Sequence, residues 1–404
     1  MLARWAAVLM LLSVVSCVEA QVDPTKRELI QLGYNYLLHG HAPLSDYAFY
    51  YAHLPNFYRS NLTLRLAIAP VYLDGEVGLV SLLGEHTDLG LGLNGGGFAD
   101  SYAEIRQGKY LKEESFTGHG GGISASIYHL FNPGQRVPLN GLVRAEFHQS
   151  VYSRDTDTAS GFELPDDQST LNFRTGFRWG GREPLIFPEV AMEISAWYEN
   201  MFRLRPSAYG FAGDRETKDT SHLFWARALL AYTLPKLKHN FSVSLTGGAS
   251  LDADRFSAYR LGGILPMASE FPLTLPGYYY QEVSAQKFVL FGAQYALPLD
   301  ANKNWALNFV ATTAGVEYLP GLEQPGRWHS GVGGGISYRS PKEAWQFLIA
   351  YAYGIDAIRD QGRGAHSIGF LLQFDLERAH RNLFDPAEQP MRSRGLERIF
   401  RIFD

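Results

Sequence analysis

Apolar and polar residues alternate along many segments of this 404-residue chain. In residues 143–151, Val143, Phe147 and Val151 share one side of an extended chain, while charged and polar residues occupy the other side. The same two-residue period recurs in residues 171–179. A period of two is typical of a β-strand with one apolar and one polar face, so the pattern predicts an all-β fold.

Fourteen segments fit this pattern and are predicted as strands. They are residues 46–53, 60–72, 87–98, 118–130, 139–153, 169–180, 189–204, 221–234, 239–251, 284–298, 304–318, 328–340, 345–356 and 366–377. Asp74-Gly75 could form a hairpin turn that begins an extra strand over Glu76 to Leu83. We therefore expect about 14 strands, within a range of 12–16.

The connections between these strands alternate between short and long. Short ones fall near residues 131–138, 181–188, 235–239, 299–303 and 341–344, and long ones near 99–117, 154–168, 205–220, 252–283, 319–327 and 357–365. Short periplasmic turns and long extracellular loops produce this alternation in outer-membrane barrels. The pattern predicts a transmembrane antiparallel up-and-down β-barrel. The alternative is a soluble periplasmic all-β protein, whose strands also alternate.

Composition favours the barrel. Charged residues make up only 19% of the chain, which also contains 41 glycines and 14% aromatic residues. A net charge of −5 gives no basic excess, so nucleic acid is not an expected partner. Beyond the first twenty residues, no stretch reaches the roughly 18 apolar residues of a membrane helix.

The first twenty residues read as a secretory signal peptide. Arg4 provides the positive region, an apolar run follows, and cleavage is favoured after Ala20. Val14 to Cys17 loosely resembles a lipoprotein box, which leaves acylation of Cys17, the sole cysteine, as the other processing route. Either route exports the chain, and we expect it in the bacterial outer membrane.

The predicted organisation has four parts. The signal peptide covers residues 1–20, an N-terminal periplasmic segment covers 21–45, the barrel covers 46–377, and a C-terminal periplasmic tail covers 378–404. Asp23-Pro24-Thr25 resembles a helix start, so the N-terminal segment is a candidate for a short helix. The apolar side of residues 394–404 could form an interfacial helix or belong to a frayed tail.

Residues 259–299 contain a longer pattern that combines Leu261-Gly262-Gly263, a Gly277-Tyr278 tip and a strand ending in Tyr295 and Pro298-Leu299. It resembles the C-terminal barrel of the bacterial surface antigen family, whose superfamily contains outer-membrane assembly factors and two-partner secretion transporters. The resemblance implies that this extracellular loop folds into the lumen, docks its tip on the inner wall, and is followed by five strands. The motif positions are Arg260, Leu261, Gly262, Gly263, Pro276, Gly277 and Tyr278.

Three departures put the family's activity in doubt. Pro276 stands where the tip arginine is expected, and Gln294 and Ala296 stand where the strand has Glu and Arg. Between Ala20 and the clear strand at residue 60 there is no room for polypeptide-transport-associated domains, on which the family's activities depend. The chain therefore resembles a divergent relative that lacks those domains.

Catalytic and metal-binding patterns are weak, and we predict no enzyme, cofactor or metal site. The HGGG-like run around His119 lacks a Gly-x-Ser-x-Gly partner and is better explained as a strand approached closely by a neighbour. His329-Ser330 and His366-Ser367 could suggest a lipid hydrolase, but adjacent strand residues point to opposite faces. The Asp155/Asp157 and Asp252/Asp254 clusters are candidates for calcium or for solvated loops.

Charged side chains on the polar faces of adjacent strands are expected to line the lumen. They are Arg144, Glu146, His148, Arg174, Arg178, Glu193 and Glu199. They would set ion selectivity, anchor the inward loop, or form ion pairs that hold the barrel rigid.

The leading functional hypothesis is transport across, or organisation of, the outer membrane. A general diffusion porin is the alternative, and a barrel lipid hydrolase is a further one. Expected partners are outer-membrane lipid and lipopolysaccharide, together with a periplasmic or secreted protein whose identity the sequence does not give.

Overall fold

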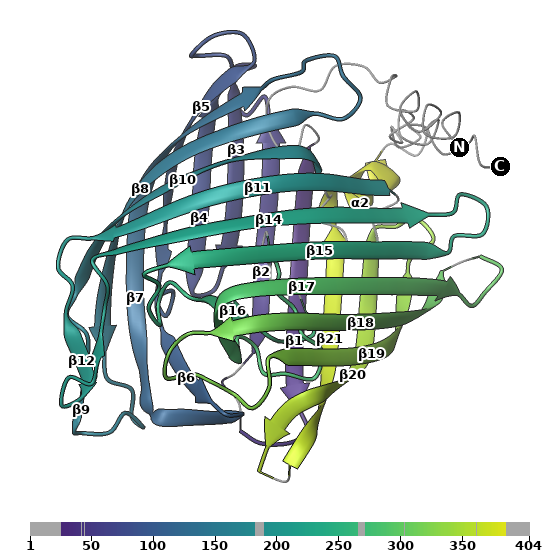
Figure 1. Cartoon of the computed structure of the whole chain (residues 1–404). Helices are drawn as coiled ribbons and strands as arrows, with labels where there is room; N and C mark the ends of the chain where they lie inside the picture. Colours follow the sequence, from purple (N-terminus) through teal and green to yellow (C-terminus); the bar gives the residue numbers. More distant parts are fainter. Residues whose placement is uncertain are drawn as a thin grey trace, which may run out of the picture.

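Sixteen antiparallel strands close into a barrel (Figure 1). The structure is a computed structural model that describes residues 26–41, 43, 45–181, 190–265, 271–302, 304–360 and 362–384. Each barrel strand pairs with its neighbours in the chain, and β1 (Arg27–Leu37) pairs with β21 (Gly362–Asp375) to close the ring. Closure gives every strand two partners, which a sheet in a lipid bilayer requires.

The remaining barrel strands follow in chain order around the ring. They are β2 (Asp46–Pro55), β3 (Leu62–Ala69), β4 (Tyr72–Leu79), β5 (Thr87–Gly96), β7 (Lys109–Leu130), β8 (Leu139–Ser153), β10 (Gln168–Gly181), β11 (Val190–Arg203), β14 (Thr220–Thr233), β15 (Asn240–Leu251), β17 (Val283–Pro298), β18 (Trp305–Tyr318), β19 (Trp328–Arg339) and β20 (Trp345–Arg359). Two short strands, β6 (Tyr102–Arg106) and β16 (Tyr259–Leu261), pair with β7 and β17 at the ends of the wall.

All fourteen predicted strands are present, and the barrel has two more. The helix expected near the N-terminus is wrong over residues 27–37, which form β1, so the barrel starts at Arg27 and not at residue 46. The turn predicted at Asp74-Gly75 is also wrong, because both residues lie inside β4 and the hairpin turns at residues 70–71. The long loop expected at 357–365 is a tight hairpin between β20 and β21.

The barrel wall has apolar side chains on its outer face and charged or polar side chains on its inner face, which is the reverse of the arrangement in a soluble protein. On β10, the outward Phe177 is 54% exposed, whereas the adjacent inward Arg178 is only 5% exposed. The same arrangement holds for the outward Phe147, Leu171 and Phe173, all of which are exposed. Apolar side chains that cover the outside of a closed barrel are stable in lipid and not in water. The soluble all-β alternative is therefore wrong.

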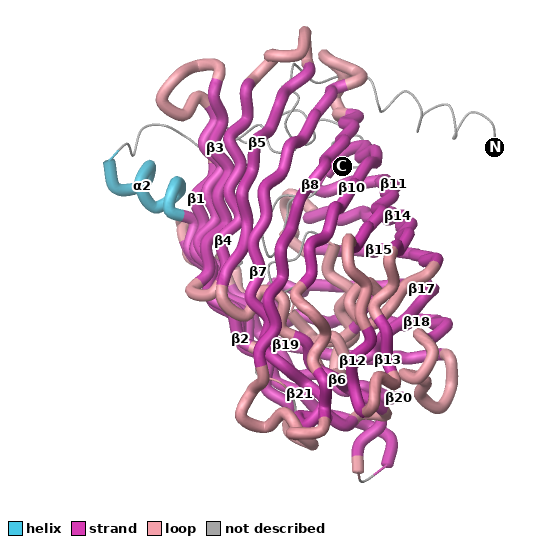
Figure 2. Tube along the Cα trace, turned by 90° about the vertical axis from the view of Figure 1, so that its left-hand side faces the viewer, coloured by secondary structure: helices cyan, strands magenta, loops and turns pink. Residues whose placement is uncertain are grey.

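The two ends of the barrel differ. One end, here called the long-loop end, carries β6, β16, and a small sheet of β9 (Phe162–Glu163), β12 (Ala208–Phe211) and β13 (Arg215–Glu216). The opposite short-turn end carries the start of β1, the end of β21 and the short connections. Figure 2 shows the loops of the long-loop end gathered together below the wall. From β5 onward, the predicted alternation of connections is confirmed for the described residues, apart from the hairpin at 357–365. The connection predicted at 181–188 lies almost wholly outside the described residues, and the β3–β4 turn at residues 70–71 is short although it lies at the long-loop end.

The chain turns into helix α2 (Leu376–Phe384) directly after β21, outside the wall beside β1 (Figure 2). Asp375 caps the helix, since its carboxylate accepts a hydrogen bond from Arg378 N at 2.9 Å. Among the described residues, no helix is long and apolar enough to cross a membrane. The signal peptide, Cys17 and residues 394–404 lie outside the described residues.

Glu343 links α2 to the turn between β19 and β20, and the link should weaken in acid. Burial raises the Glu343 pKa, but the guanidinium groups of Arg339 and Arg378 outweigh it and hold the pKa below its usual range. Because the Glu343 pKa is lower in the folded state, the ion pair stabilises that state fully at pH values above the ordinary glutamate pKa, about 4.3. The stabilisation is lost as the pH falls through the folded-state pKa. We expect α2 amides to exchange roughly twofold to fivefold faster below that pH, after correction for intrinsic rates.

Hydrogen exchange of Glu343→Gln provides the comparison. The variant should exchange faster than wild type at pH 7 and show no further acceleration in acid, whereas Glu323→Gln, in a loop at the other end, should match wild type. Unchanged α2 exchange in Glu343→Gln would rule out this ion pair as the cause.

Candidate functional site

A loop between β16 and β17 lies inside the barrel and forms the candidate site. Its described residues are 262–265 and 271–282, and the segment 262–282 is here called the lumen loop. Gly262 N donates to Leu273 O and Leu275 N donates to Gly263 O, both at 2.9 Å, so the loop doubles back as a narrow hairpin. Gly262 and Gly263 have positive φ angles, which glycine adopts without strain. Leu261, Leu275 and Tyr278 are fully buried, which explains the apolar composition of this segment.

The tip of the lumen loop touches the wall at β19 and β20 through backbone atoms. A Cβ added to Gly277 would lie 1.9 Å from Gly354 N, and one added to Gly331 would lie 2.1 Å from Pro276 O. Tyr278 Oη lies 3.1 Å from His329 Nδ1 of β19. Such close approach leaves no room for side chains at these glycines. The lumen-directed loop implied by the family resemblance is present, and its tip is docked.

A buried ion pair fastens the loop at its return. Glu282 accepts hydrogen bonds from both terminal nitrogens of Arg359, at 2.8 and 2.9 Å, and both side chains are buried. The Arg359 guanidinium also lies 3.8 Å from the centre of the Tyr279 ring. The chain lacks an arginine at position 276 of the loop. Instead, Arg359 of the wall provides the positive charge and Glu282 of the loop provides the negative charge. A two-pronged pair of this kind fixes geometry as well as charge.

The other side of the loop reaches the opposite wall. The Phe271 ring packs edge-on against Trp197 of β11 and Trp225 of β14, with ring centres 5.6 and 5.9 Å apart. Near the start of the loop, a Cβ on Gly369 of β21 would lie 2.7 Å from Ile264. In the ring of sixteen strands, β11 is almost half a turn from β21. The lumen loop therefore crosses the interior from wall to wall.

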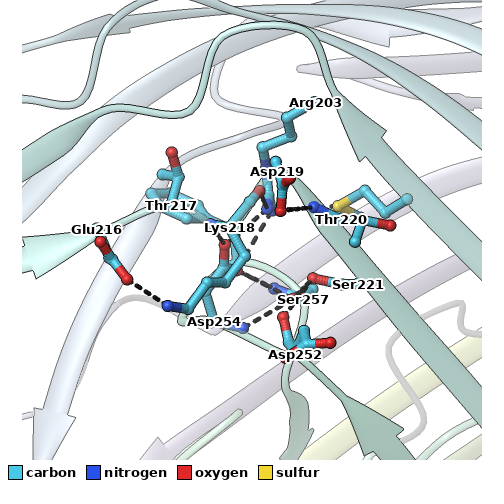
Figure 3. Close-up of polar contacts among 12 residues, drawn as sticks. Arg203, Glu216, Thr217, Lys218, Asp219, Thr220, Ser221, Asp252, Asp254 and Ser257 are labelled. Carbon is cyan, nitrogen blue, oxygen red and sulfur yellow. Dashed lines mark hydrogen bonds and ion pairs between the residues drawn. The ribbon is translucent and has the colours of Figure 1, made fainter.

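A hydrogen-bonded turn anchors the chain just before the loop (Figure 3). Asp254 accepts hydrogen bonds from Arg203 at 2.6 Å and from Lys218 N at 2.8 Å, and it also bonds Ser257. These contacts tie residues 252–258 to the end of β11 and to the following loop. The Asp254 carboxylate thus accepts hydrogen bonds from groups of the protein, and the hypothesis that it binds calcium is wrong.

Replacing Asp254 with Asn should loosen this anchor. Arg203 is 2% exposed and would keep a buried charge without its anion, a change that typically costs about 3–5 kcal/mol. In purified folded protein, we expect trypsin to cleave after Arg255 much faster in Asp254→Asn than in wild type. The control is Asp252→Asn. The Asp252 side chain lies two residues away in the sequence and is exposed, so this variant should be cleaved at the wild-type rate. Equal cleavage of both variants would show that the anchor does not depend on this carboxylate.

A second ion-pair cluster joins the loops of the long-loop end. Glu104 lies 3.6 Å from Arg215 and 3.3 Å from Arg255, and Arg215 also contacts Glu114. Below it, the rings of Tyr102, Phe116, Phe162 and Tyr209 form a buried cluster. The motif residue Arg260 joins the same region by donating to Ala103 O at 2.7 Å. The loops at this end are therefore packed together and not separately solvated.

The predicted lumen-lining residues fall into two groups. On β8, Arg144 lies 3.0 Å from Glu146, and His148 hydrogen bonds Asp100 at 2.8 Å. Burial raises the Asp100 pKa, but hydrogen bonds from His148 and Ser150 outweigh it and lower the pKa overall. The second group, Arg174, Arg178, Glu193 and Glu199, lies on β10 and β11 near Phe271, where Glu193 is 3.8 Å from Arg178. Within this second group, Arg174 and Arg178 contact the lumen loop, with their guanidinium carbons 5.5 Å from the centre of the Phe271 ring.

The candidate catalytic residues are used in other ways. His329 bonds the Tyr278 and Tyr318 hydroxyls, and His366 bonds the Tyr351 hydroxyl, so neither imidazole activates its neighbouring serine. The glycines around His119 are approached closely, as predicted: a Cβ on Gly120 would lie 1.9 Å from the Asp100 carboxylate. In the described part of the chain, no group of three or more His, Cys, Asp or Glu side chains could hold a metal ion.

Sequence reasoning missed the residues that hold the loop in place. Arg359 lies in a segment predicted as a loop, and Glu282 and Phe271 lie in the irregular stretch itself. The one usable signal was an acidic residue in the return of the family pattern, which Glu282 matches. No local pattern indicates which wall strand faces each of them.

These features define the class of protein: an outer-membrane β-barrel with a loop folded into its lumen. Comparison with solved structures shows that the fold is similar to that of the CdiB and BamA barrels. CdiB from Acinetobacter baumannii is similar over 87% of this chain and 60% of its own, with a TM-score of 0.54 and 11% identity. This chain thus spans less than two thirds of that protein's length.

Two further structures agree. BamA from Haemophilus ducreyi lacking POTRA domains 1–3 is similar over 86% of this chain and 70% of its own, with a TM-score of 0.52 and 12% identity. CdiB from Escherichia coli is similar over 90% of this chain and 67% of its own, with a TM-score of 0.54 and 9% identity. No family model matches the sequence, and no curated protein matches it. The similarity is one of fold, and the five strands after residue 283 agree with the resemblance found in the sequence.

Proposed function

We propose that this chain is an outer-membrane transport or assembly barrel whose lumen is held plugged at rest by the lumen loop. Its work requires that loop to move aside. The long-loop end faces the cell exterior and the short-turn end faces the periplasm. No catalytic step is part of this proposal.

The observation that carries the proposal is the fixation of the lumen loop on both walls. Its tip has backbone contact with Gly331 and Gly354, its return is held by the buried Arg359–Glu282 pair, and Phe271 is packed on the far wall. A diffusion porin instead keeps a water-filled lumen. Here the interior contains an apolar cluster that includes Leu261, Leu275 and Tyr278. Such a cluster is stable as a plug and unsuited to a steady aqueous channel.

The outer face suits the expected partners. Exposed apolar side chains cover the wall, as contact with outer-membrane lipid requires, and lipopolysaccharide would surround the long-loop end. A polypeptide from the periplasm or in transit to the surface is the proposed cargo. This assignment draws on the fold, which CdiB and BamA share.

Planar-bilayer recordings test the proposal. Wild-type protein should give small, flickering currents, because the lumen loop obstructs the interior. Deleting residues 264–276 should remove the plug and give larger, steadier currents. The anchor variant Asp254→Asn should fall between them if it loosens the loop. Large and steady currents from intact wild-type protein would overturn the plug and establish the diffusion-porin alternative.

A further inference from the structure

A polar cavity of about 260 Å³ lies at the rim of the barrel, at the long-loop end. It is formed where β20 ends and β21 begins, beside the chain that follows β1. The side chains that line it include His39, Tyr353, Asp360, Arg363 and His366. Cavities that enclose a whole drug-sized ligand usually measure about 300–1,000 Å³, so this cavity suits a small ion or the head group of a larger molecule.

The cavity borders the lipid-facing surface of the barrel. Along β21, the outward residues Phe370 and Ile368 are exposed apolar side chains, and the next residue on the same face is His366. The His366 ring packs against Tyr353 and His39, with ring centres 4.8 and 5.1 Å apart. The apolar outer face therefore gives way to polar groups at the cavity, where lipid tails end and head groups begin.

The cavity offers hydrogen-bond donors whose own contacts are loose or missing. The Arg363 side chain is 61% exposed, and its guanidinium lies 4.0 Å from the Asp356 carboxylate, which is beyond hydrogen-bond length. Nδ1 of His39 is buried and has no hydrogen-bond partner among the described residues. In His366, Nδ1 bonds the Tyr351 hydroxyl, which leaves Nε2 to meet a ligand. A buried polar atom without a partner costs free energy that a suitable ligand would recover.

The other acidic groups beside the cavity already have cations of their own. Asp360 lies 3.1 Å from Lys109, and Glu282 bonds both terminal nitrogens of Arg359, which also lines the cavity. The residues next to the lining in the sequence that the structure does not describe carry no charge: they are Ala42, Leu44 and Gln361. Asp360 and Glu282 therefore do not satisfy the donors of the cavity.

We propose that this cavity binds a phosphate group. A phosphate has several acceptor oxygens, which the guanidinium of Arg363, the imidazoles of His39 and His366 and the Tyr353 hydroxyl can meet together. Arg363 supplies the charge-assisted bonds, and it gives up little in leaving Asp356, because exposed ion pairs at such a distance contribute about 0–1 kcal/mol.

Two sources could provide this phosphate. One is a phosphorylated lipid of the outer leaflet, such as the lipid A part of lipopolysaccharide, and the other is a free phosphate compound in solution. The inference goes beyond the proposed function, because the cavity is at the rim and its occupation requires no movement of the lumen loop.

Binding of lipid A to the purified full chain in detergent, measured by native mass spectrometry, tests the inference. Lipid A is compared with lipid A from which the phosphates have been removed by phosphatase. Wild type should bind the phosphorylated form about tenfold more tightly. Arg363→Gln should lower the affinity for lipid A about tenfold, and His39→Leu about threefold, because each removes a donor to the phosphate. Both variants should bind the dephosphorylated lipid as wild type does.

Arg154→Gln is the matched control, because Arg154 is an exposed arginine in another loop of the same end. It should bind lipid A as tightly as wild type, and heat-modifiable migration on a gel checks that every variant is folded. If folded Arg363→Gln binds lipid A as tightly as wild type, or if wild type does not prefer the phosphorylated form, the cavity is not a phosphate site.

Competition with inorganic phosphate distinguishes the two sources. If lipid A stays bound to wild type against a large excess of inorganic phosphate, the site takes lipid phosphate. If inorganic phosphate displaces the lipid at a comparable concentration, the site takes free phosphate compounds. Large and steady wild-type currents would overturn the plug and leave the phosphate site standing, whereas failure of Arg363→Gln to weaken binding would overturn the site alone.

Discussion

Gly277→Ala should release the tip of the lumen loop and open the barrel. The added Cβ would lie 1.9 Å from Gly354 N and 2.6 Å from Tyr353 C, and backbone atoms in a barrel wall cannot move aside. The φ of +84° adds strain of about 1–2 kcal/mol for a residue with a side chain. Overpacking adds about 1–3 kcal/mol more. We expect planar-bilayer currents well above those of wild type, from protein that still folds as a barrel.

Gly134→Ala is the matched control for this substitution. Gly134 has a φ of +82°, nearly that of Gly277, but lies in a short turn where a Cβ would meet nothing within 4 Å. It should carry the backbone strain without the collision and leave the currents unchanged. If both alanine variants conduct alike, close approach at the tip does not hold the loop.

Arg359→Met should be among the most damaging single substitutions at the site. It leaves Glu282, which is 1% exposed, as a buried charge without its cation. Breaking a buried pair from one side typically costs about 3–5 kcal/mol. We expect a lower urea midpoint for the barrel and larger currents, because the return of the lumen loop loses its attachment. Arg359→Lys should be intermediate, since an ammonium keeps the charge but not the two-pronged geometry.

The double variant Arg359→Met with Glu282→Leu separates charge from packing. It removes both ions, so most of the stability should return while the loop keeps an apolar contact. Removal of the exposed Lys287–Glu317 pair, at 3.1 Å, should change stability by less than about 1 kcal/mol. A double variant as unstable as Arg359→Met would show that desolvated charge is not the cause.

The lumen loop shows how far the sequence could be followed. Leu261-Gly262-Gly263 and Gly277-Tyr278 indicated a loop in the lumen, and the structure places it there. Pro276, in place of the expected arginine, raised doubt about the family's activity and not about the position of the loop. The cation that holds the loop is Arg359, at the end of β20, which pairs with Glu282. Which strand faces a given loop residue depends on how the strands are arranged around the barrel, and no local pattern records that arrangement.

The first strand illustrates the same limit from the other direction. Residues 27–37 partly fit helical spacing, and helix was the predicted structure. They form a strand because the edges of β2 and β21 would otherwise carry unpaired backbone groups in lipid. That requirement comes from the last strand of the chain, more than 300 residues away. Local propensity was overridden by closure of the barrel.

By itself, the sequence determined fourteen of the sixteen barrel strands and their two faces, because side-chain direction in a strand alternates every residue and depends on nothing distant. It therefore indicated which residues meet lipid and which meet the lumen, and the order of short and long connections. Only the tertiary structure decided which lumen-facing groups meet: Arg359 with Glu282, Gly277 with Gly354, and Phe271 with three arginines. Those contacts arise when sixteen strands close on one another and bring residues far apart in the chain within reach.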